Sequence, residues 1–191
     1  MTDVAARLID DRLREVPRTV LTVIAGAVLM TLAAKSQIPF WPVPMTLHTL
    51  AVMAFALAFG PRIAVAIFLT YLAAGAAGLP VFSGSPERGV GLAYLAGPTG
   101  GYLFGYLLAS GLVGVLARGK GVIGRFGAML AGLAIVYAIG AAWLAAYVPV
   151  GQILALGVTP FLAGDLVKLG VVAALSVAVP SLRDWLRIAG R

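Results

Sequence analysis

Two ionisable residues stand inside a strongly apolar stretch near the end of the chain. Asp165 and Lys168 are three residues apart in the segment GDLVK, which places both side chains on one face of a helix. A charged side chain at the centre of a membrane-spanning helix costs about 2.5–3.5 kcal/mol on insertion scales. The pair either neutralises itself as an ion pair or forms a ligand site, in which Lys168 meets a carboxylate and Asp165 accepts hydrogen bonds from N–H donors. The insertion cost favours the ligand site, because leucine would insert more easily.

Other side chains that can recognise a small molecule lie in separate segments. His48 can donate to a ligand or complete a structural hydrogen bond at the end of a helix. Arg88 can attract an anion or remain a solvated loop charge. Several aromatic residues can stack on a ring or belong to the aromatic belt of a membrane interface. They are Trp41, Phe82, Tyr94 and Tyr102.

The residue inventory argues against several kinds of catalytic site. A single histidine excludes a multi-histidine metal site, and the absence of cysteine excludes disulfides and zinc–thiolate sites. Residues 114–120 have the spacing of a phosphate-binding P-loop, but Gly121 replaces the required Ser or Thr and an apolar helix precedes them. We find no Ser-His-Asp or paired-carboxylate arrangement. We therefore expect no enzymatic activity, no metal, no cofactor and no ATP hydrolysis by this chain.

The composition predicts an integral membrane protein. Of the 191 residues, 61% are hydrophobic and 11% are charged, against about 25% charged residues in soluble domains. A membrane-spanning helix needs roughly 20 apolar residues, so the chain allows five to seven crossings and no second domain. The N-terminus mixes acidic and basic residues and lacks the pattern of a cleaved signal peptide. We expect an all-α fold in a single transmembrane domain, residues 1–191.

Proline and glycine divide the apolar sequence into six predicted spans. Residues 1–17 should form an amphipathic cytoplasmic segment, whose short interfacial helix ends near Pro17. Residues 20–180 should form the six-helix bundle, and residues 181–191 a basic cytoplasmic tail. The predicted spans are 20–34, 45–59, 62–78, 99–117, a fifth that ends near 147, and 161–179. Because the second span is short, five spans with one re-entrant segment remain an alternative.

The basic residues give this bundle an orientation. With six spans, eleven basic residues lie on the side of the two termini, and only Lys35 and Arg88 lie on the other side. The positive-inside rule then places both termini in the cytoplasm. The net charge of +7 is divided among loops instead of following one face, which argues against a nucleic-acid partner.

This orientation brings four irregular segments to the outer ends of the spans. They are residues 41–49, 79–89, 96–102 and 164–168. Irregular backbone at membrane depth is tolerated only where it is buried in protein or lines a cavity. We therefore predict an outward-facing small-molecule cavity, mostly apolar with a few polar groups.

Small residues recur at every fourth position in three of the spans. Such ridges let helices approach closely inside the bundle or form a docking face for another protein. The first ridge is Gly97, Gly101, Gly105 and Ala109; the second is Ala134, Ala138, Ala142 and Ala146; the third is Gly170, Ala174 and Ala178.

The motifs VPMTLHTL, YLAAGAAGLPVFSG, GPTGGYLFGY and GDLVK, in this order and spacing, resemble those of the BioY family. Members are the biotin-specific substrate-binding (S) components of energy-coupling factor (ECF) transporters. The resemblance covers about residues 20–180. It implies a six-helix S-component fold, an outward-facing biotin site, and a complex with a transmembrane T component and two ABC-type ATPase subunits that use the ATP.

The resemblance also implies site residues. Asp165 and Lys168 would hold the polar ends of biotin. The candidate wall residues are Thr46, His48, Tyr71, Phe82 and Tyr102. The family usually has glutamine in place of His48. Its first helix also tends to carry alanine at every fourth position for docking to the T component, whereas the nearest pattern here is Thr22, Gly26, Met30 and Ala34.

Two other functions stay open at the level of sequence. One is a self-sufficient facilitator or proton-coupled carrier for a small carboxylate-bearing vitamin, with Asp165 as the proton site. The other is a membrane scaffold or receptor without a transported ligand. Membrane lipids are expected neighbours in every case, and a homo-oligomer is compatible with the sequence.

Overall fold

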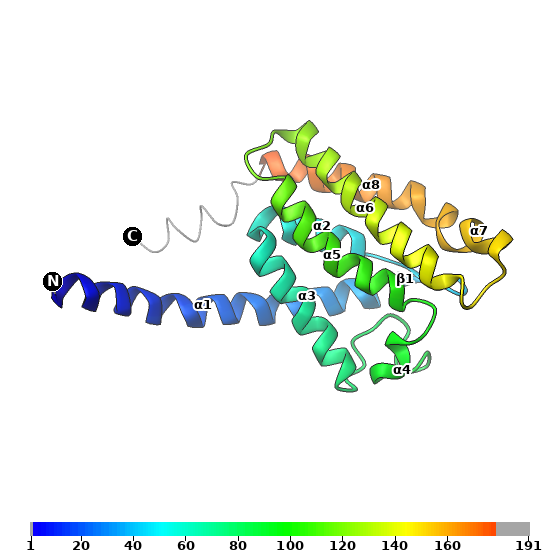
Figure 1. Cartoon of the computed structure of the whole chain (residues 1–191), viewed down its shortest axis with the longest axis horizontal. Coiled ribbons are helices and arrows are strands. Elements are labelled where there is room, and N and C mark those ends of the chain that lie inside the picture. Colours follow the sequence, from blue (N-terminus) through cyan, green and yellow to red (C-terminus); the bar gives the residue numbers. More distant parts are fainter. Residues whose placement is uncertain (1, 179–191) are drawn as a thin grey trace.

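The structure is a computed structural model that describes the backbone of residues 2–178 and the side chains of residues 16–177. The predicted basic tail, residues 181–191, lies outside the described residues. The described chain is mostly helical (Figure 1). Its helices are α1 (Thr2–Lys35), α2 (His48–Phe59), α3 (Pro61–Ala76), α4 (Gly91–Leu95), α5 (Gly100–Leu116), α6 (Val122–Leu144), η1 (Val150–Gln152), α7 (Ile153–Gly157) and α8 (Thr159–Ala178).

Three stretches of the described chain are long and apolar enough to cross a membrane. They are Val16–Lys35, Val122–Leu144 and Val150–Val177. The other apolar helices, α2, α3 and α5, are shorter. Six crossings and cytoplasmic termini therefore stay predictions, whereas the helical fold itself is confirmed.

Helix α1 does not end near Pro17, as the sequence suggested, but continues through it. Residues 16–20 are exposed, and the long apolar segment after Pro17 keeps the helix growing although the proline removes one backbone hydrogen bond. At about 1.5 Å per residue, a helix of 34 residues is about 51 Å long. This length exceeds the roughly 30 Å hydrocarbon core of a bilayer, and Figure 1 shows the N-terminal part of α1 extending away from the bundle.

Helix α5 is central to the bundle because it packs against α6, α3 and α2. Its glycines permit the closest approach. A Cβ atom added at Gly105 would lie 2.8 Å from Cα of Val136 in α6, too close for any side chain. The first small-residue ridge is therefore a helix-packing surface, as predicted.

For the other two small-residue ridges, the interpretation as packing surfaces inside the bundle is wrong. The four alanines of the second ridge, three of them in α6, are exposed, as are Gly170 and Ala174 of α8. The side chain of Ala178 lies outside the described residues. Helix α6 instead buries the face that carries Gly132, Val136 and Gly140. A four-residue spacing fixes which residues share a face, but not which face turns inward.

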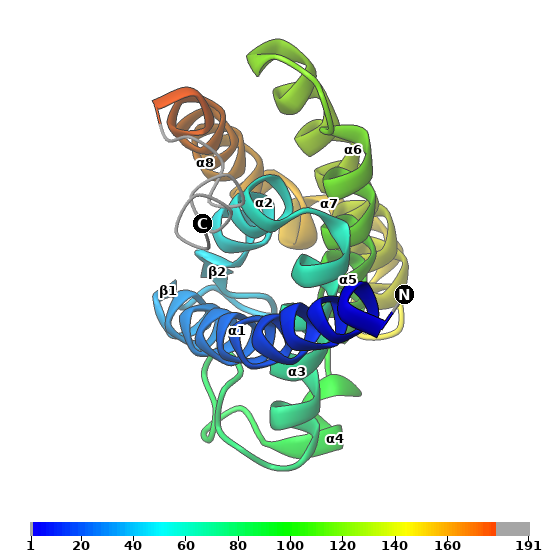
Figure 2. The ribbon, with the colours of Figure 1, turned by 90° about the vertical axis from the view of Figure 1, so that its left-hand side faces the viewer.

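The pattern on α1 that most resembled a docking motif also faces inward. Gly26, Met30 and Ala34 are buried, and a Cβ atom added at Gly26 would lie 2.5 Å from the side chain of Ile67 in α3. This face of α1 therefore belongs to the packing between α1 and α3, which Figure 2 shows crossing each other.

The segment between α1 and α2 forms a short hairpin that the sequence did not predict. Strands β1 (Gln37–Ile38) and β2 (Met45–Thr46) pair antiparallel, with Gln37 opposite Thr46. The three prolines between them exclude a regular helix, as expected. The hairpin turns the chain back toward the bundle, which brings Thr46 next to α8.

Candidate functional site

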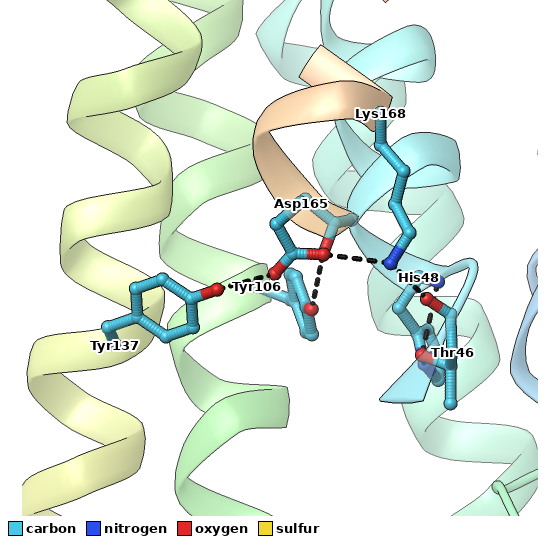
Figure 3. Close-up of polar contacts among 7 residues, drawn as sticks. Thr46, His48, Tyr106, Tyr137, Asp165 and Lys168 are labelled. Carbon is cyan, nitrogen blue, oxygen red and sulfur yellow. Dashed lines mark hydrogen bonds and ion pairs between the residues drawn. The ribbon is translucent and has the colours of Figure 1, made fainter. Parts of the chain in front are cut away.

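Asp165 and Lys168 form an ion pair in the first half of α8 (Figure 3). Nζ of Lys168 lies 2.8 Å from Oδ1 of Asp165 and donates a second hydrogen bond, also of 2.8 Å, to the backbone carbonyl of Thr46. Asp165 is buried, with 4% of its surface exposed. The lysine therefore ties α8 to the hairpin as well as neutralising the carboxylate.

Tyr137 of α6 holds the other oxygen of this carboxylate. Its hydroxyl donates a hydrogen bond of 2.7 Å to Oδ2 of Asp165. Both carboxylate oxygens thus have one donor each, from two different elements. Tyr137 was absent from our candidates, although a lone hydroxyl in the middle of an apolar span was a signal that could have indicated it.

His48 stands at the start of α2 and bridges two hydroxyl groups. Its Nδ1 lies 2.9 Å from Oγ1 of Thr46, and its Nε2 lies 2.9 Å from the hydroxyl of Tyr71. The imidazole ring also stacks on Tyr106 of α5, with ring centroids 5.6 Å apart. Both ring nitrogens are therefore satisfied within the protein, and the ring face is covered.

A cavity of about 510 Å³, including its part open to the exterior, lies beside these residues. All four irregular segments contribute to its lining. The lining residues are Val43, Pro44, Met45, Thr46, His48, Thr49, Ser83, Tyr94, Thr99, Tyr102, Leu103, Tyr106, Tyr137, Phe161, Asp165 and Lys168.

Five of the predicted site residues lie in this lining: Thr46, His48, Tyr102, Asp165 and Lys168. Tyr102 turns its hydroxyl away, because it donates a 2.8 Å hydrogen bond to the carbonyl of Gly157. Besides Tyr137, our candidates lacked Tyr106, whose hydroxyl lies 2.7 Å from Oγ1 of Thr49. The motif GPTGGYLFGY contains both Tyr102 and Tyr106, so its second tyrosine was a missed signal.

The other three predicted residues lie outside the lining. Tyr71 stands behind His48. Phe82 is fully buried and stacks on Tyr94, with centroids 4.7 Å apart and the planes at 20°. Phe82 thus supports the cavity wall that Tyr94 forms. Arg88 lies on the loop between α3 and α4 and points toward the hairpin loop.

Arg88 fastens two loops together beside the cavity. Its Nη2 and Nη1 atoms donate hydrogen bonds of 3.0 and 3.3 Å to the carbonyls of Phe40 and Pro42, and its guanidinium lies 5.7 Å from the centre of the Trp41 ring. On the same loop, the carbonyl of Ser85 accepts a hydrogen bond of 2.5 Å from Nζ of Lys35. We call this set of contacts the loop clasp.

Tyr94 extends the loop clasp to the short helix α4. Its hydroxyl donates a hydrogen bond of 2.7 Å to the carbonyl of Ser83, whose own hydroxyl bonds to Gln37. Burial raises the pKa of Tyr94 above its ordinary value, so the phenol keeps its proton and stays a donor. The two loops and α4 therefore form one connected cover over this side of the cavity.

The site offers groups that can bind a small molecule. Within the described part of the chain, no three His, Asp or Glu side chains are grouped to hold a metal ion. The cavity combines aromatic walls with one charged pair whose atoms can both donate and accept hydrogen bonds. In a helical membrane protein, such a cavity is typical of the class of proteins that bind a small molecule.

Comparisons with known proteins agree with this class. The sequence profile of the BioY family matches residues 6–184. The biotin transporter BioY of Thermotoga maritima is 38% identical over 156 residues, which are 81% of this chain and 90% of that protein. A probable biotin transporter BioY of Pyrococcus horikoshii is 38% identical over 140 residues, 73% of this chain and 82% of that protein. The chain belongs to the BioY family. It is therefore a multi-pass membrane protein of prokaryotic type, and its role is transport and not enzymatic catalysis.

A solved structure shares the fold. It is the S-component for biotin from an ECF-type ABC transporter, with a TM-score of 0.74 and 23% sequence identity, and the match covers 85% of this chain and 90% of that one. The all-α S-component fold predicted from the sequence is therefore confirmed.

Proposed function

We propose that this chain captures biotin in the cavity beside Asp165 and Lys168 as the substrate-binding subunit of an ECF-type transporter. Its family and its relatives, which are named biotin transporters, support the substrate. The observation that carries the proposal is the charged pair, since Lys168 and Asp165 both line the cavity and lie 2.8 Å apart. A T component and two ABC-type ATPase subunits would supply the energy.

The geometry of the pair sharpens which part of biotin it holds. Biotin carries a cyclic urea at one end and a carboxylate at the other, joined by an apolar chain. Because Asp165 and Lys168 are only 2.8 Å apart, they serve one end of the ligand and not both. A urea presents N–H donors beside a carbonyl acceptor and so matches Asp165 and Lys168 together, whereas a carboxylate would be repelled by Asp165. We infer that the pair binds the urea.

The rest of the lining suits the remaining atoms. The aromatic side chains of Tyr94, Tyr102 and Phe161 would pack on the bicyclic ring and the apolar chain. Tyr71 and Phe82 would act indirectly, by supporting His48 and Tyr94. Arg88 would keep the cover closed through the loop clasp.

Calorimetry of the purified protein with biotin tests the substrate, and biotin methyl ester tests the orientation. We expect tight binding of biotin, none of lipoate or thiamine at the same concentrations, and a large loss on Lys168→Ala. If the pair binds the urea, Lys168→Ala lowers the affinity for biotin and the affinity for its methyl ester by the same factor. A loss seen with biotin alone would assign Lys168 to the carboxylate, and wild-type affinity no higher than that of an unrelated membrane protein would refute the substrate.

Uptake assays separate the subunit from a self-sufficient carrier. We expect cells that contain this chain and an energy-coupling module to accumulate biotin, and cells with this chain alone to accumulate none. Accumulation by the chain alone, abolished by a protonophore and by Asp165→Asn, would instead favour the proton-coupled carrier.

A further inference from the structure

A second cavity lies at the opposite end of the same helices. It is formed where α2 and α5 end, whereas the first cavity lies where these helices begin. Figure 1 shows the turn between α5 and α6 at the end of the bundle remote from α7. The volume is about 580 Å³, including the part open to the exterior. The lining residues are Ala56, Leu57, Ala58, Gly60, Gly114, Ala117, Arg118, Gly119 and Arg125.

Two guanidinium groups give this second cavity its charge. Arg125 donates one hydrogen bond of 2.6 Å to the carbonyl of Ser176 in α8, which uses one of its five N–H donors. The acidic side chains among residues 16–177 are Glu87 and Asp165, and Asp165 lines the other cavity while Glu87 lies on the loop of the clasp. Among the described side chains, no carboxylate therefore competes for Arg118 or Arg125.

The helix ends at this cavity do not reverse that charge. Helices α2 and α5 end there with partial negative charge, and α3 and α6 begin there with partial positive charge, so these contributions offset each other. The remaining walls are small and apolar. A Cβ atom added at Gly114 would lie 2.5 Å from the nitrogen of Pro61, so the α5 backbone rests directly on the turn between α2 and α3.

We propose that the second cavity binds the phosphate group of an anionic membrane lipid. Guanidinium groups bind phosphate oxygens through two parallel hydrogen bonds, and the apolar walls suit the glycerol and the first acyl carbons. The cavity lies at the bundle end that also carries Arg62 and Lys120, where basic residues are expected to face the anionic inner leaflet. A basic pocket between spanning helices at that level is a favourable place for a lipid headgroup.

Native mass spectrometry of the full-length protein tests this site. The probes are phosphatidylglycerol, phosphatidylcholine and inorganic phosphate, and the variants are Arg118→Gln and the double substitution Arg118→Gln, Arg125→Gln. Arg62→Gln is the matched control, because it removes one charge from the same end without altering the lining. We expect wild type and control to retain phosphatidylglycerol in preference to phosphatidylcholine, and the double variant to bind it about tenfold or more weakly. Arg118→Gln, which leaves the bond to Ser176 intact, should show an intermediate loss.

Competition with free phosphate identifies the source of the anion. Displacement of phosphatidylglycerol by millimolar phosphate in the wild type would support a phosphate-binding site. Arginine-dependent binding of free phosphate without retention of the lipid would overturn the lipid as ligand. Equal lipid retention by wild type and double variant would overturn the site. The site would also be overturned if the arginine substitutions impaired assembly with energy-coupling subunits but left lipid retention unchanged. Unchanged biotin binding by both variants shows that they are folded.

Discussion

The hydroxyl of Tyr137 in α6 donates a hydrogen bond of 2.7 Å to Oδ2 of Asp165 in α8, while Lys168 occupies Oδ1 of the same carboxylate (Figure 3). The two donors fix the plane of the carboxyl group from opposite sides. Asp165 is thereby held at the cavity wall with its orientation set before any ligand arrives. Such preorganisation reduces the entropy lost on binding.

Tyr137→Phe removes this hydroxyl and keeps the ring. Because hydrogen bonds to charged groups contribute roughly 1.5–3 kcal/mol, we expect biotin affinity to fall by about tenfold or more, with little change in the amount of folded protein. Calorimetry provides the affinity. Tyr147→Phe is the control, since Tyr147 bonds to the carbonyl of Ala96 outside the lining. Equal losses from the two substitutions would contradict a specific role for Tyr137.

The charged pair allows structural and ligand-binding roles to be separated. Lys168→Met leaves Asp165 buried without its cation. Removing one partner of a buried ion pair lowers the free energy of unfolding by about 3–5 kcal/mol. The double substitution Asp165→Asn, Lys168→Met removes both charges and should recover most of the thermal stability. We expect it to bind no biotin nevertheless, as measured by calorimetry beside a thermal unfolding curve. Recovery of both stability and binding would make the pair purely structural.

His48→Gln replaces the imidazole ring with an amide. The glutamine amide carries both a donor and an acceptor, so it can replace the contacts with Thr46 and Tyr71. We expect unfolding free energy to change by less than about 1 kcal/mol and biotin binding to persist. His48→Leu should cost about 1–3 kcal/mol, because it leaves the Tyr71 hydroxyl buried without a partner. Thermal unfolding measures the stability of both variants. Equal destabilisation by His48→Gln and His48→Leu would contradict the role of His48 as a bridge between Thr46 and Tyr71.

Arg88→Gln should loosen the loop clasp, because the bonds to Phe40 and Pro42 and the contact with the Trp41 ring are lost. We expect biotin to dissociate about three- to tenfold faster, in line with the roughly 1 kcal/mol of a typical net hydrogen bond. Hydrogen exchange should also increase in residues 36–44. Rates come from stopped-flow displacement with excess labelled biotin. Lys120→Gln, at the other end of the bundle, should change neither quantity; an unchanged dissociation rate for Arg88→Gln would argue against a cover.

Helix packing can be tested with a matched pair of leucine substitutions. Gly105→Leu places a side chain against the α6 backbone, where a Cβ atom alone would be 2.8 Å from Cα of Val136. We expect this variant to lose several kcal/mol of stability or to fail to fold. Ala138→Leu, on the exposed ridge of α6, should unfold at the wild-type temperature. Fluorescence-detected size exclusion after heating measures both, and a destabilised Ala138→Leu would indicate that the ridge packs against something in the intact protein.

Much of this protein followed from residue types and their spacing. Hydrophobicity and the proline and glycine positions gave the helical class and the approximate ranges of α2, α3, α5 and α8. The spacing of Asp165 and Lys168 placed them on one face, and the gathering of the four irregular segments gave the cavity. Pro17 misled, because a proline inside a helix removes one backbone hydrogen bond and can leave the helix continuous instead of ending it.

By itself, then, the sequence determined which side chains share a helix face, because that depends only on the periodicity of the backbone. The tertiary structure decided which face turns inward and which distant groups meet. Tyr137 reaches Asp165 across 28 residues, and Lys168 reaches the carbonyl of Thr46 across 122. Those meetings depend on how each helix is rotated and positioned by its neighbours, through close contacts such as that of Gly105 with Val136. The packing of the whole bundle, and not a local sequence pattern, places Asp165 and Lys168 in the lining of the cavity.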